Sequence, residues 1–399
     1  MDPGRSGARP RLRLEALDGI RGLAALFVVY FHIGVLLSPV MATMSGPWRL
    51  LHRATEHGHE AVVAFIVLSG FVLMLPVVRA GRPPELASYF ARRSRRILPP
   101  YFAALAIFLL AGIGWNLAAS STLANPFIHD ASFGGILSHF FLLQNWKRSW
   151  ALTVDPPMWT VATEWQIYFF FPFVLLPIWR RLGSPAAVLA GLCIGMLPVV
   201  LLPRNTNFDT FCPWFLALFA LGMTAAAIST SSRVSTFFQK PMFWGFTTVI
   251  LFLGIGLFQM RLHAYWNQTG IWCKDFLNGV AIASLLVYLA RCQLSGMVRQ
   301  PLIARVLESP VCVQLGAFSY SLYLTHLPIV DLIVLALRSH LRGTSYVITL
   351  FVLAPPAAVA CAYVFHLAFE RPASLDRYGR MLGRWKRKMT PEHLAIAGA

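Results

Sequence analysis

The chain has 399 residues, of which 57% are hydrophobic and only 13% are charged, and its mean hydropathy is +0.62. Soluble domains carry about 25% charged residues, so this composition excludes an ordinary soluble protein. The formal net charge of +18 does not indicate a nucleic-acid partner, because basic cytoplasmic loops of membrane proteins produce the same excess.

The N-terminal arm is basic and precedes the first apolar segment. It contains Arg5, Arg9, Arg11 and Arg13, as the n-region of a signal peptide would. The apolar segment is long, however, and no small-residue cleavage site stands out, so we expect an uncleaved first span. Residues 1–14 are then a basic cytoplasmic arm.

Ten segments are long and apolar enough to cross a bilayer as helices, which takes about 20 residues each. They predict an all-α fold, a polytopic transmembrane helical bundle. The apolar segment 132–146 is short, and it could be an interfacial or re-entrant piece or an eleventh span. The ten predicted spans are 18–40, 60–79, 97–115, 158–178, 186–203, 211–228, 243–261, 273–291, 312–336 and 346–369.

The basic residues indicate how these spans are oriented. With the N-terminus in the cytoplasm, 25 of the 34 Lys and Arg residues fall on the cytoplasmic side, as the positive-inside rule requires. Both termini are therefore expected in the cytoplasm. The transmembrane domain is assigned to residues 15–372, and the basic tail 373–399 is expected to contact anionic lipid headgroups.

The cysteines indicate neither a metal site nor a disulfide framework. All six lie in or beside apolar segments, and no CxxC pair occurs, so we interpret them as packing residues. The sequence also lacks a glycine-rich phosphate loop and a nucleophile elbow.

Two ionisable side chains, Arg21 and His32, lie on the first predicted span. Such side chains are costly inside a bilayer and mark functional sites. Eleven residues of helix separate them by about 16 Å. If Arg21 marks the cytoplasmic boundary, His32 lies near the middle of the membrane. This spacing predicts a site that receives an anion from one side and performs chemistry in the interior.

A cluster of arginines precedes the third span, on the same predicted side of the membrane as Arg21. An ordinary positive-inside anchor would look the same, but guanidinium groups also bind phosphates bidentately. A phosphorylated ligand such as a nucleotide or coenzyme A would suit this surface. The arginines are Arg92, Arg93, Arg95 and Arg96.

Glu164 lies about two turns into the fourth span from the outer side. A carboxylate at that depth needs a partner or a water-filled cavity. It could form an ion pair with an arginine, or it could orient or charge His32 as a general base. Tyr168 follows four residues later and therefore shares a helix face with Glu164.

Further polar residues mark the second and ninth spans. Ser319, Tyr323 and His326 recur at i, i+4 and i+7, which predicts a polar stripe facing the bundle interior or a cavity. Ser69 and Gly70 add a hydroxyl and a close-approach glycine at mid-membrane depth, a pair that is also typical of helix packing.

These segments resemble the acyltransferase-3 family of membrane acyltransferases, from Leu14 to about Pro372. Six motifs occur in the family's order and on the expected spans. Thr160 stands where the family commonly has serine, Val63 where many members have an acidic residue, and Trp165 where a second glutamate is frequent. The matching residues are Arg21 and His32; Ser69, Gly70 and Phe71; Arg92, Arg93, Arg96, Ile97, Pro99 and Tyr101; Trp159, Glu164 and Tyr168; Tyr320, Tyr323, His326 and Pro328; and Glu370, Arg371 and Pro372.

The resemblance implies an integral membrane O-acyltransferase of a bacterial inner or plasma membrane. It would move an acyl group, by family habit acetyl, from acyl-coenzyme A (acetyl-CoA) on the cytoplasmic side to a hydroxyl of a carbohydrate or glycosylated small molecule, without a metal. His32 would act as general base or transient acyl carrier, with Glu164 as the second catalytic residue. The coenzyme would contact Arg21, Arg92, Arg93 and Arg96, and the substrate passage would be lined by Ser69, Tyr168, Tyr323 and His326.

Two other functions fit part of the pattern. A polytopic transporter of a small anionic solute also needs buried charges. A transporter of a neutral solute, by contrast, would not need four arginines at one mouth. A structural membrane subunit would have no use for the buried arginine, histidine and glutamate. Consumption of coenzyme A separates the enzyme from both.

Overall fold

The computed structural model describes residues 14–118, 124–129, 132–202, 208–231, 235–261, 270–295 and 300–374. These ranges contain helices and no strand, which confirms the predicted all-α fold. The basic arm up to residue 13 and the tail from residue 375 lie outside the described residues. The helices are α1 (Glu15–Met41), α2 (Pro47–Thr55), α3 (Gly58–Ala80), α4 (Leu86–Ala118), α5 (Phe133–Phe140), η1 (Gln144–Trp146), α6 (Arg148–Ala151), η2 (Pro156–Met158), α7 (Trp159–Phe170), η3 (Phe171–Leu175), α8 (Leu176–Leu201), α9 (Phe208–Phe211), α10 (Phe215–Thr230), α11 (Thr236–Gln239), α12 (Pro241–Arg261), α14 (Ile271–Leu294), α15 (Leu302–Leu307), α16 (Pro310–Ala317), α17 (Ser319–Leu337), α18 (Gly343–Phe365), η4 (His366–Glu370) and α19 (Arg371–Ser374).

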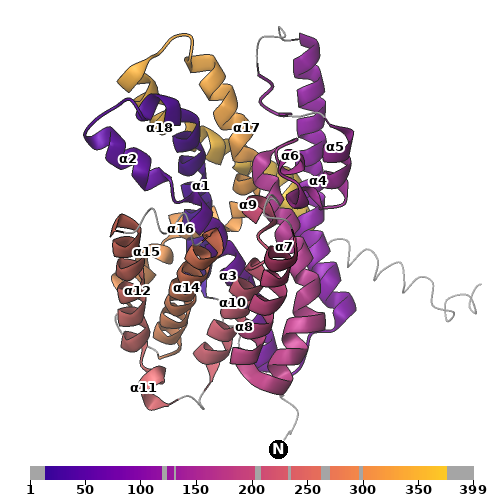
Figure 1. The fold of residues 1–399 in the computed structure, drawn as a ribbon, viewed down its shortest axis with the longest axis vertical. Helices are drawn as coiled ribbons and strands as arrows, with labels where there is room; N and C mark the ends of the chain where they lie inside the picture. Colours follow the sequence, from indigo (N-terminus) through magenta and orange to yellow (C-terminus); the bar gives the residue numbers. More distant parts are fainter. Residues whose placement is uncertain are drawn as a thin grey trace, which may run out of the picture.

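Nine helical stretches in the described part of the chain are long and apolar enough to cross a membrane. The chain is therefore a multi-pass membrane protein. Figure 1 shows α1, α2, α17 and α18 grouped toward the top of the bundle, above α8, α10, α12 and α14. The nine stretches are Glu15–Met41, Pro47–Ala80, Leu86–Ala118, Pro156–Leu201, Phe208–Thr230, Pro241–Gln259, Ile271–Leu294, Ser319–Leu337 and Gly343–Glu370.

The longest stretch, Pro156–Leu201, is a hairpin that supplies two crossings. Gly183 breaks it with a φ of 84°, a backbone conformation that glycine adopts without steric cost. The ring of Trp159 lies 6.3 Å from that of Phe215, while a Cβ atom on Gly195 would lie 2.8 Å from the Cα atom of Trp214. Both ends of the hairpin therefore meet the same end of α10, and the ten expected spans are accounted for.

The short apolar segment 132–146 does not form an eleventh span. It contains the eight-residue helix α5 and the three-residue turn η1, and eight helical residues rise only about 12 Å. The hydroxyl of Ser132 caps α5 by accepting a hydrogen bond from the Gly135 amide at 3.2 Å. The segment packs beside α6 on the loop that precedes α7.

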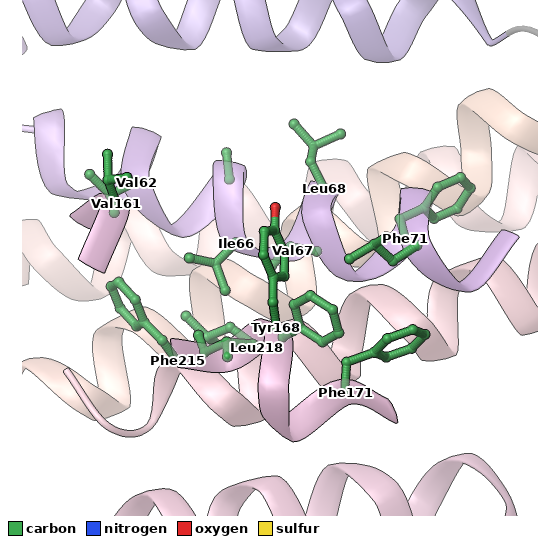
Figure 2. Close-up of a cluster of buried hydrophobic side chains, with 14 of the residues drawn as sticks. Val62, Ile66, Val67, Leu68, Phe71, Val161, Tyr168, Phe171, Phe215 and Leu218 are labelled. Carbon is green, nitrogen blue, oxygen red and sulfur yellow. The ribbon is translucent and has the colours of Figure 1, made fainter. Parts of the chain in front are cut away.

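The core of the bundle is the crossing of α3 with α10. A Cβ atom added to Gly70 would lie 2.0 Å from the Phe219 carbonyl oxygen, and one added to Gly222 would lie 2.0 Å from the Val67 carbonyl oxygen. Only glycine at both positions allows this approach, since neighbouring backbone cannot give way. Figure 2 shows the side chains around this crossing, which include Val62, Ile66, Val67, Leu68, Phe71, Val161, Tyr168, Phe171, Phe215 and Leu218.

A second buried cluster fixes the rotation of α1. Ala25, Val29, Ile33 and Leu37 are fully buried against residues of α17 and α18, and they repeat every four residues along one face of the helix. Because His32 adjoins this face, its ring reaches α17. The packing of α1 thus determines the partner of the histidine.

Candidate active site

A pocket of about 760 Å³, measured to its open mouth, lies between α1, α3, α4, α7 and α17. It follows α7 from Thr160 to Tyr168, a rise of about 12 Å. Seven of the predicted site residues line it: Arg21, Ser69, Arg93, Arg96, Glu164, Tyr168 and Tyr323. The remaining lining residues are Val62, Phe65, Ile66, Val72, Ile97, Thr160, Val161, Ser319 and Tyr320.

One end of the pocket, the basic end, is formed by Arg21, Arg93 and Arg96. Arg21 donates to Asp18 at 3.2 Å, and 14% of its side chain is exposed. The guanidinium of Arg93 lies 5.9 Å from the centroid of the Tyr168 ring. The Nε atom of Arg93 is buried and has no hydrogen-bond partner among the described residues, so this end offers an unused donor as well as positive charge.

Glu164 occupies the middle of the pocket. Its Oε1 atom accepts hydrogen bonds from the Ser69 hydroxyl, across from α3, and from the Tyr168 hydroxyl at 2.5 Å. These two donors hold the carboxylate in one orientation and satisfy one of its oxygens. Glu164 thus shares its pocket with the arginines of the basic end without a direct ion pair to any of them in the described chain.

The opposite end of the pocket, the hydroxyl end, is formed by Thr160 and Tyr323. The Thr160 Oγ1 atom lies 2.8 Å from the Tyr323 hydroxyl and 3.1 Å from the Pro157 carbonyl oxygen. Phe65 packs against the Tyr323 ring edge-to-face, with a centroid separation of 5.8 Å. Apart from these two hydroxyls, this end is apolar, with Val62 and Val161 completing it.

His32 and His326 form a hydrogen-bonded pair behind the hydroxyl end. The His326 Nε2 atom lies 3.0 Å from the His32 Nδ1 atom, and the ring centroid of Tyr323 lies 6.0 Å from that of His326. His326 is fully buried. Neither histidine is among the described residues that line the pocket, and Tyr323, which does line it, connects the pocket wall to His326.

The hydrogen bonds of this pair fix the tautomers of both rings. The His326 Nδ1 atom faces two carbonyl oxygens, those of Leu322 at 3.1 Å and Tyr323 at 2.9 Å, so it carries the hydrogen and Nε2 accepts. The His32 Nδ1 atom faces the Val28 carbonyl oxygen at 3.0 Å as well as that acceptor nitrogen, so it also carries a hydrogen. In the neutral ring, the Nε2 atom of His32 is left with a free lone pair.

Three sequence-based expectations differ from this geometry. Arg92 is exposed on α4 and lies outside the pocket, so its position gives no support to a role in binding the coenzyme. His326 contacts His32 instead of lining the substrate passage. Glu164 bonds Ser69 and Tyr168, and within the described ranges no hydrogen bond joins it to His32. The expected direct orientation of His32 by Glu164 is therefore replaced by orientation through His326.

Ser319, predicted to face the bundle interior or a cavity, does line the pocket. Phe65 was not predicted as a pocket residue, and the pairing of His59 with Asp275 was not predicted either. Phe65 belongs to the phenylalanine-rich run before Ser69, which was its only signal. The His59 Nε2 atom lies 2.9 Å from the fully buried Asp275, which also accepts from the Trp214 indole at 2.8 Å. Because His59 and Asp275 are 216 positions apart, no spacing along the chain could have predicted their contact.

Comparison with known proteins identifies related sequences but no related structure. A family model described as an acyltransferase domain matches residues 14–367. Acyltransferase MdmB of Streptomyces mycarofaciens is 31% identical over 176 residues, which are 43% of this chain and 41% of that protein. No solved structure is significantly similar to the chain.

Two further relatives are named as O-acetyltransferases. A putative O-acetyltransferase of Staphylococcus aureus (strain COL) is 22% identical over 346 residues, covering 80% of this chain and 51% of that protein. The peptidoglycan O-acetyltransferase OatA of Listeria monocytogenes is 22% identical over 185 residues, 45% of this chain and 27% of that protein. The chain thus spans about half, or less, of the length of the curated relatives it matches.

Proposed function

Because the chain belongs to the acyltransferase-3 family, we propose that it is a multi-pass membrane O-acyltransferase with acyl-coenzyme A as its donor. The acceptor is a hydroxyl of a carbohydrate or of a glycosylated small molecule. The acyl group is acetyl, in line with the relatives named as O-acetyltransferases. A carbohydrate acceptor is in line with the relative named for peptidoglycan.

The observation that carries the proposal is the order of groups along one path. The basic end of the pocket presents Arg21, Arg93 and Arg96, and the unpartnered Nε atom of Arg93 suits a phosphate oxygen. Along α1, His32 lies eleven residues beyond Arg21, a rise of about 16 Å. Phosphates held by the arginines would therefore leave an extended thioester arm to run through the pocket toward the histidine.

The orientation of the bundle follows from charge. Ten crossings would bring the two ends of the described chain to one face, and the positive-inside rule favours the cytoplasm for that face. The basic end of the pocket then opens toward cytoplasmic acyl-coenzyme A. The bacterial relatives support a place in a bacterial inner or plasma membrane.

In the reaction we propose, His32 is the general base. Its Nε2 lone pair takes the proton of the acceptor hydroxyl as the acceptor oxygen bonds to the thioester carbonyl carbon. The carbon–sulfur bond then breaks, and the proton passes from His32 to the departing sulfur of coenzyme A. His326 keeps the His32 ring in the required tautomer throughout, and no metal ion is needed for this balance.

Glu164 serves the donor side of the same pocket. Held by Ser69 and Tyr168, it lies between the basic end and the hydroxyl end. Its free oxygen can accept a hydrogen bond from an amide of the pantetheine arm, which would fix the arm along α7. Glu164 thus positions the donor, while the histidine pair acts at the thioester.

The proposal is tested with the purified protein in lipid nanodiscs and in sealed vesicles of defined orientation. Calorimetry should detect binding of acetyl-coenzyme A, and vesicles exposing the cytoplasmic face should bind it while vesicles of the opposite orientation do not. Absence of binding in nanodiscs would contradict the enzyme. Uptake of a small anion such as acetate into proteoliposomes, without coenzyme A binding, would instead favour a transporter.

A further inference from the structure

The hydroxyl groups that line the pocket differ in whether their hydrogens are already used. Ser69 and Tyr168 both donate to Glu164. Ser319 donates to the Gly316 carbonyl oxygen at 3.0 Å, and Tyr320 donates to the Ile97 carbonyl oxygen at 3.0 Å. Each of these four hydrogens has an acceptor within the protein and is not free for a ligand.

The two remaining hydroxyls, those of Thr160 and Tyr323, face each other at the hydroxyl end. Two arrangements of hydrogens fit their contacts. If Thr160 donates to Pro157, then Tyr323 donates to Thr160. If Thr160 donates to Tyr323, which is the shorter of its two contacts at 2.8 Å, the hydrogen of Tyr323 is free. In the second arrangement Tyr323 is the one uncommitted hydroxyl donor among the described residues of the pocket.

The position of Tyr323 is where negative charge would develop. The attack of a hydroxyl on a thioester places charge on the carbonyl oxygen, and donors aimed at that oxygen supply a large part of catalysis in acyl transfer. Tyr323 lies between the pocket that would hold the thioester arm and the buried His326. Val62, Phe65 and Val161 line the same pocket, and a hydrogen bond is stronger beside such apolar side chains than in water.

We propose that Tyr323 is a catalytic residue whose hydroxyl, held by a hydrogen bond from Thr160, donates to the thioester carbonyl oxygen and stabilises the oxyanion of the transition state. Tyr323 gives up no proton in this role. The carbon–oxygen bond to the acceptor forms, the carbon–sulfur bond breaks, and the acceptor proton travels through His32 to sulfur. The inference rests on the proposed function, because it requires a bound thioester.

Three variants separate the hydroxyls from the packing of the ring. Tyr323→Phe removes the donor and keeps the ring contacts with Phe65 and His326. Thr160→Val removes the hydrogen bond that orients Tyr323, and Thr160→Ser keeps it. Tyr363→Phe is the matched control, because Tyr363 lies on α18, is 50% exposed and is outside the pocket.

The decisive measurement needs no knowledge of the acceptor. Isotope-edited infrared spectroscopy of bound [1-¹³C]acetyl-coenzyme A reports a hydrogen bond to its carbonyl as a lowered stretching frequency. The wild type, Thr160→Ser and Tyr363→Phe should show the lowered frequency, and Tyr323→Phe should not. Thr160→Val should give an intermediate shift. Binding of S-ethyl-coenzyme A, which lacks the carbonyl, should be equal in all five proteins.

Turnover gives a second measurement, with the methyl glycoside of N-acetylglucosamine as acceptor probe. Tyr323→Phe should lower kcat by about 10²–10³-fold while the KM for acetyl-coenzyme A is unchanged. An identical carbonyl frequency in wild type and Tyr323→Phe, with both binding the donor, would overturn the role of Tyr323 and leave the proposed function standing. Failure of every variant and of the wild type to bind acetyl-coenzyme A would remove the proposed function itself.

Discussion

The Nε2 atom of His326 lies 3.0 Å from the Nδ1 atom of His32, although 294 residues separate the two histidines. Two backbone carbonyls fix the hydrogen of His326 on Nδ1, so its Nε2 can only accept in the neutral ring. His32 must then present the hydrogen at Nδ1 and the lone pair at Nε2. The packing of α1 against α17 thus determines which ring nitrogen of His32, the predicted base, carries the hydrogen.

Replacing His326 by glutamine should lower kcat without changing the KM for acetyl-coenzyme A. The His32 ring would keep its bond to Val28 and lose the partner that sets its rotation. A misplacement of about 1 Å in a catalytic group can cost about 10²-fold in rate. Steady-state kinetics would check this, with His340→Gln as a control because His340 is exposed. An unchanged kcat in the His326 variant would contradict the positioning role.

Two neighbouring arginines on α4 should differ sharply in their effect on donor binding. Arg93 lines the pocket with an unpartnered Nε atom, whereas Arg92 is exposed outside it. Hydrogen bonds to charged groups contribute about 1.5–3 kcal/mol, so Arg93→Ala should weaken acetyl-coenzyme A binding by about 10–100-fold. Arg92→Ala should leave binding nearly unchanged. Calorimetry compares the two, and equal losses would show that the pocket is not the donor site.

The crossing of α3 with α10 should not tolerate a single added methyl group at Gly70. Its Cβ atom would lie 2.0 Å from the Phe219 carbonyl oxygen, and strain of this kind typically costs about 1–3 kcal/mol. Gly254→Ala is the matched control, because no heavy atom of the described ranges lies within 4 Å of a Cβ atom there. Thermal unfolding in detergent should show a lowered midpoint for Gly70→Ala alone. A midpoint unchanged from wild type would mean that α3 and α10 leave room for a methyl group at Gly70 and do not approach as closely as described.

Asp155, just before the fourth span, should make stability depend on pH. Burial, with a smaller contribution from Asp331, raises the pKa of this carboxyl well above its usual range, and within the described part of the chain neither of its oxygens has a hydrogen-bond partner. The folded state therefore binds the proton more tightly than the unfolded state, whose pKa is about 3.9. Stability should fall as pH rises above that value, toward the folded pKa.

Asp155→Asn removes this dependence and serves as the test. The variant should unfold at a higher temperature than the wild type near pH 8, and the difference should shrink as the pH falls toward and below about 3.9, the unfolded-state pKa, because the unfolded carboxyl then takes up the proton as well. A difference that grows toward low pH would contradict the assignment. The same scan on Asp209→Asn, a change at an exposed carboxylate, controls for general effects of charge.

The sequence was sufficient to predict the all-α fold, the ten crossings and seven residues of the pocket. Each span can be recognised from its own residues, because the bilayer requires every span to be long and apolar. An ionisable residue within such a run marks a functional site for the same reason. The hairpin at Gly183 was also foreseeable as two spans, since basic residues interrupt the apolar run there. The resemblance to a family supplied the order of the motifs and the roles that were attached to them.

The pairing of side chains across helices could not be predicted in this way. The partner of His32 depends on the rotation of α1 and α17, which their buried faces set only once the bundle is assembled. The exposure of Arg92 beside the pocket-lining Arg93 depends likewise on one step of rotation about the axis of α4, about 100° per residue. Glu164 on α7 and Ser69 on α3 share a hydrogen bond across 95 positions of the chain, and no local pattern encodes that contact.

The most direct test of the account compares wild type, His32→Ala and Tyr363→Phe for release of free coenzyme A from acetyl-coenzyme A, with donor binding measured on the same samples. We expect equal donor binding in all three proteins, wild-type release in Tyr363→Phe, and a rate lower by about 10²–10⁴-fold in His32→Ala. A His32→Ala protein that releases coenzyme A at the wild-type rate would contradict the assignment of His32 as the general base.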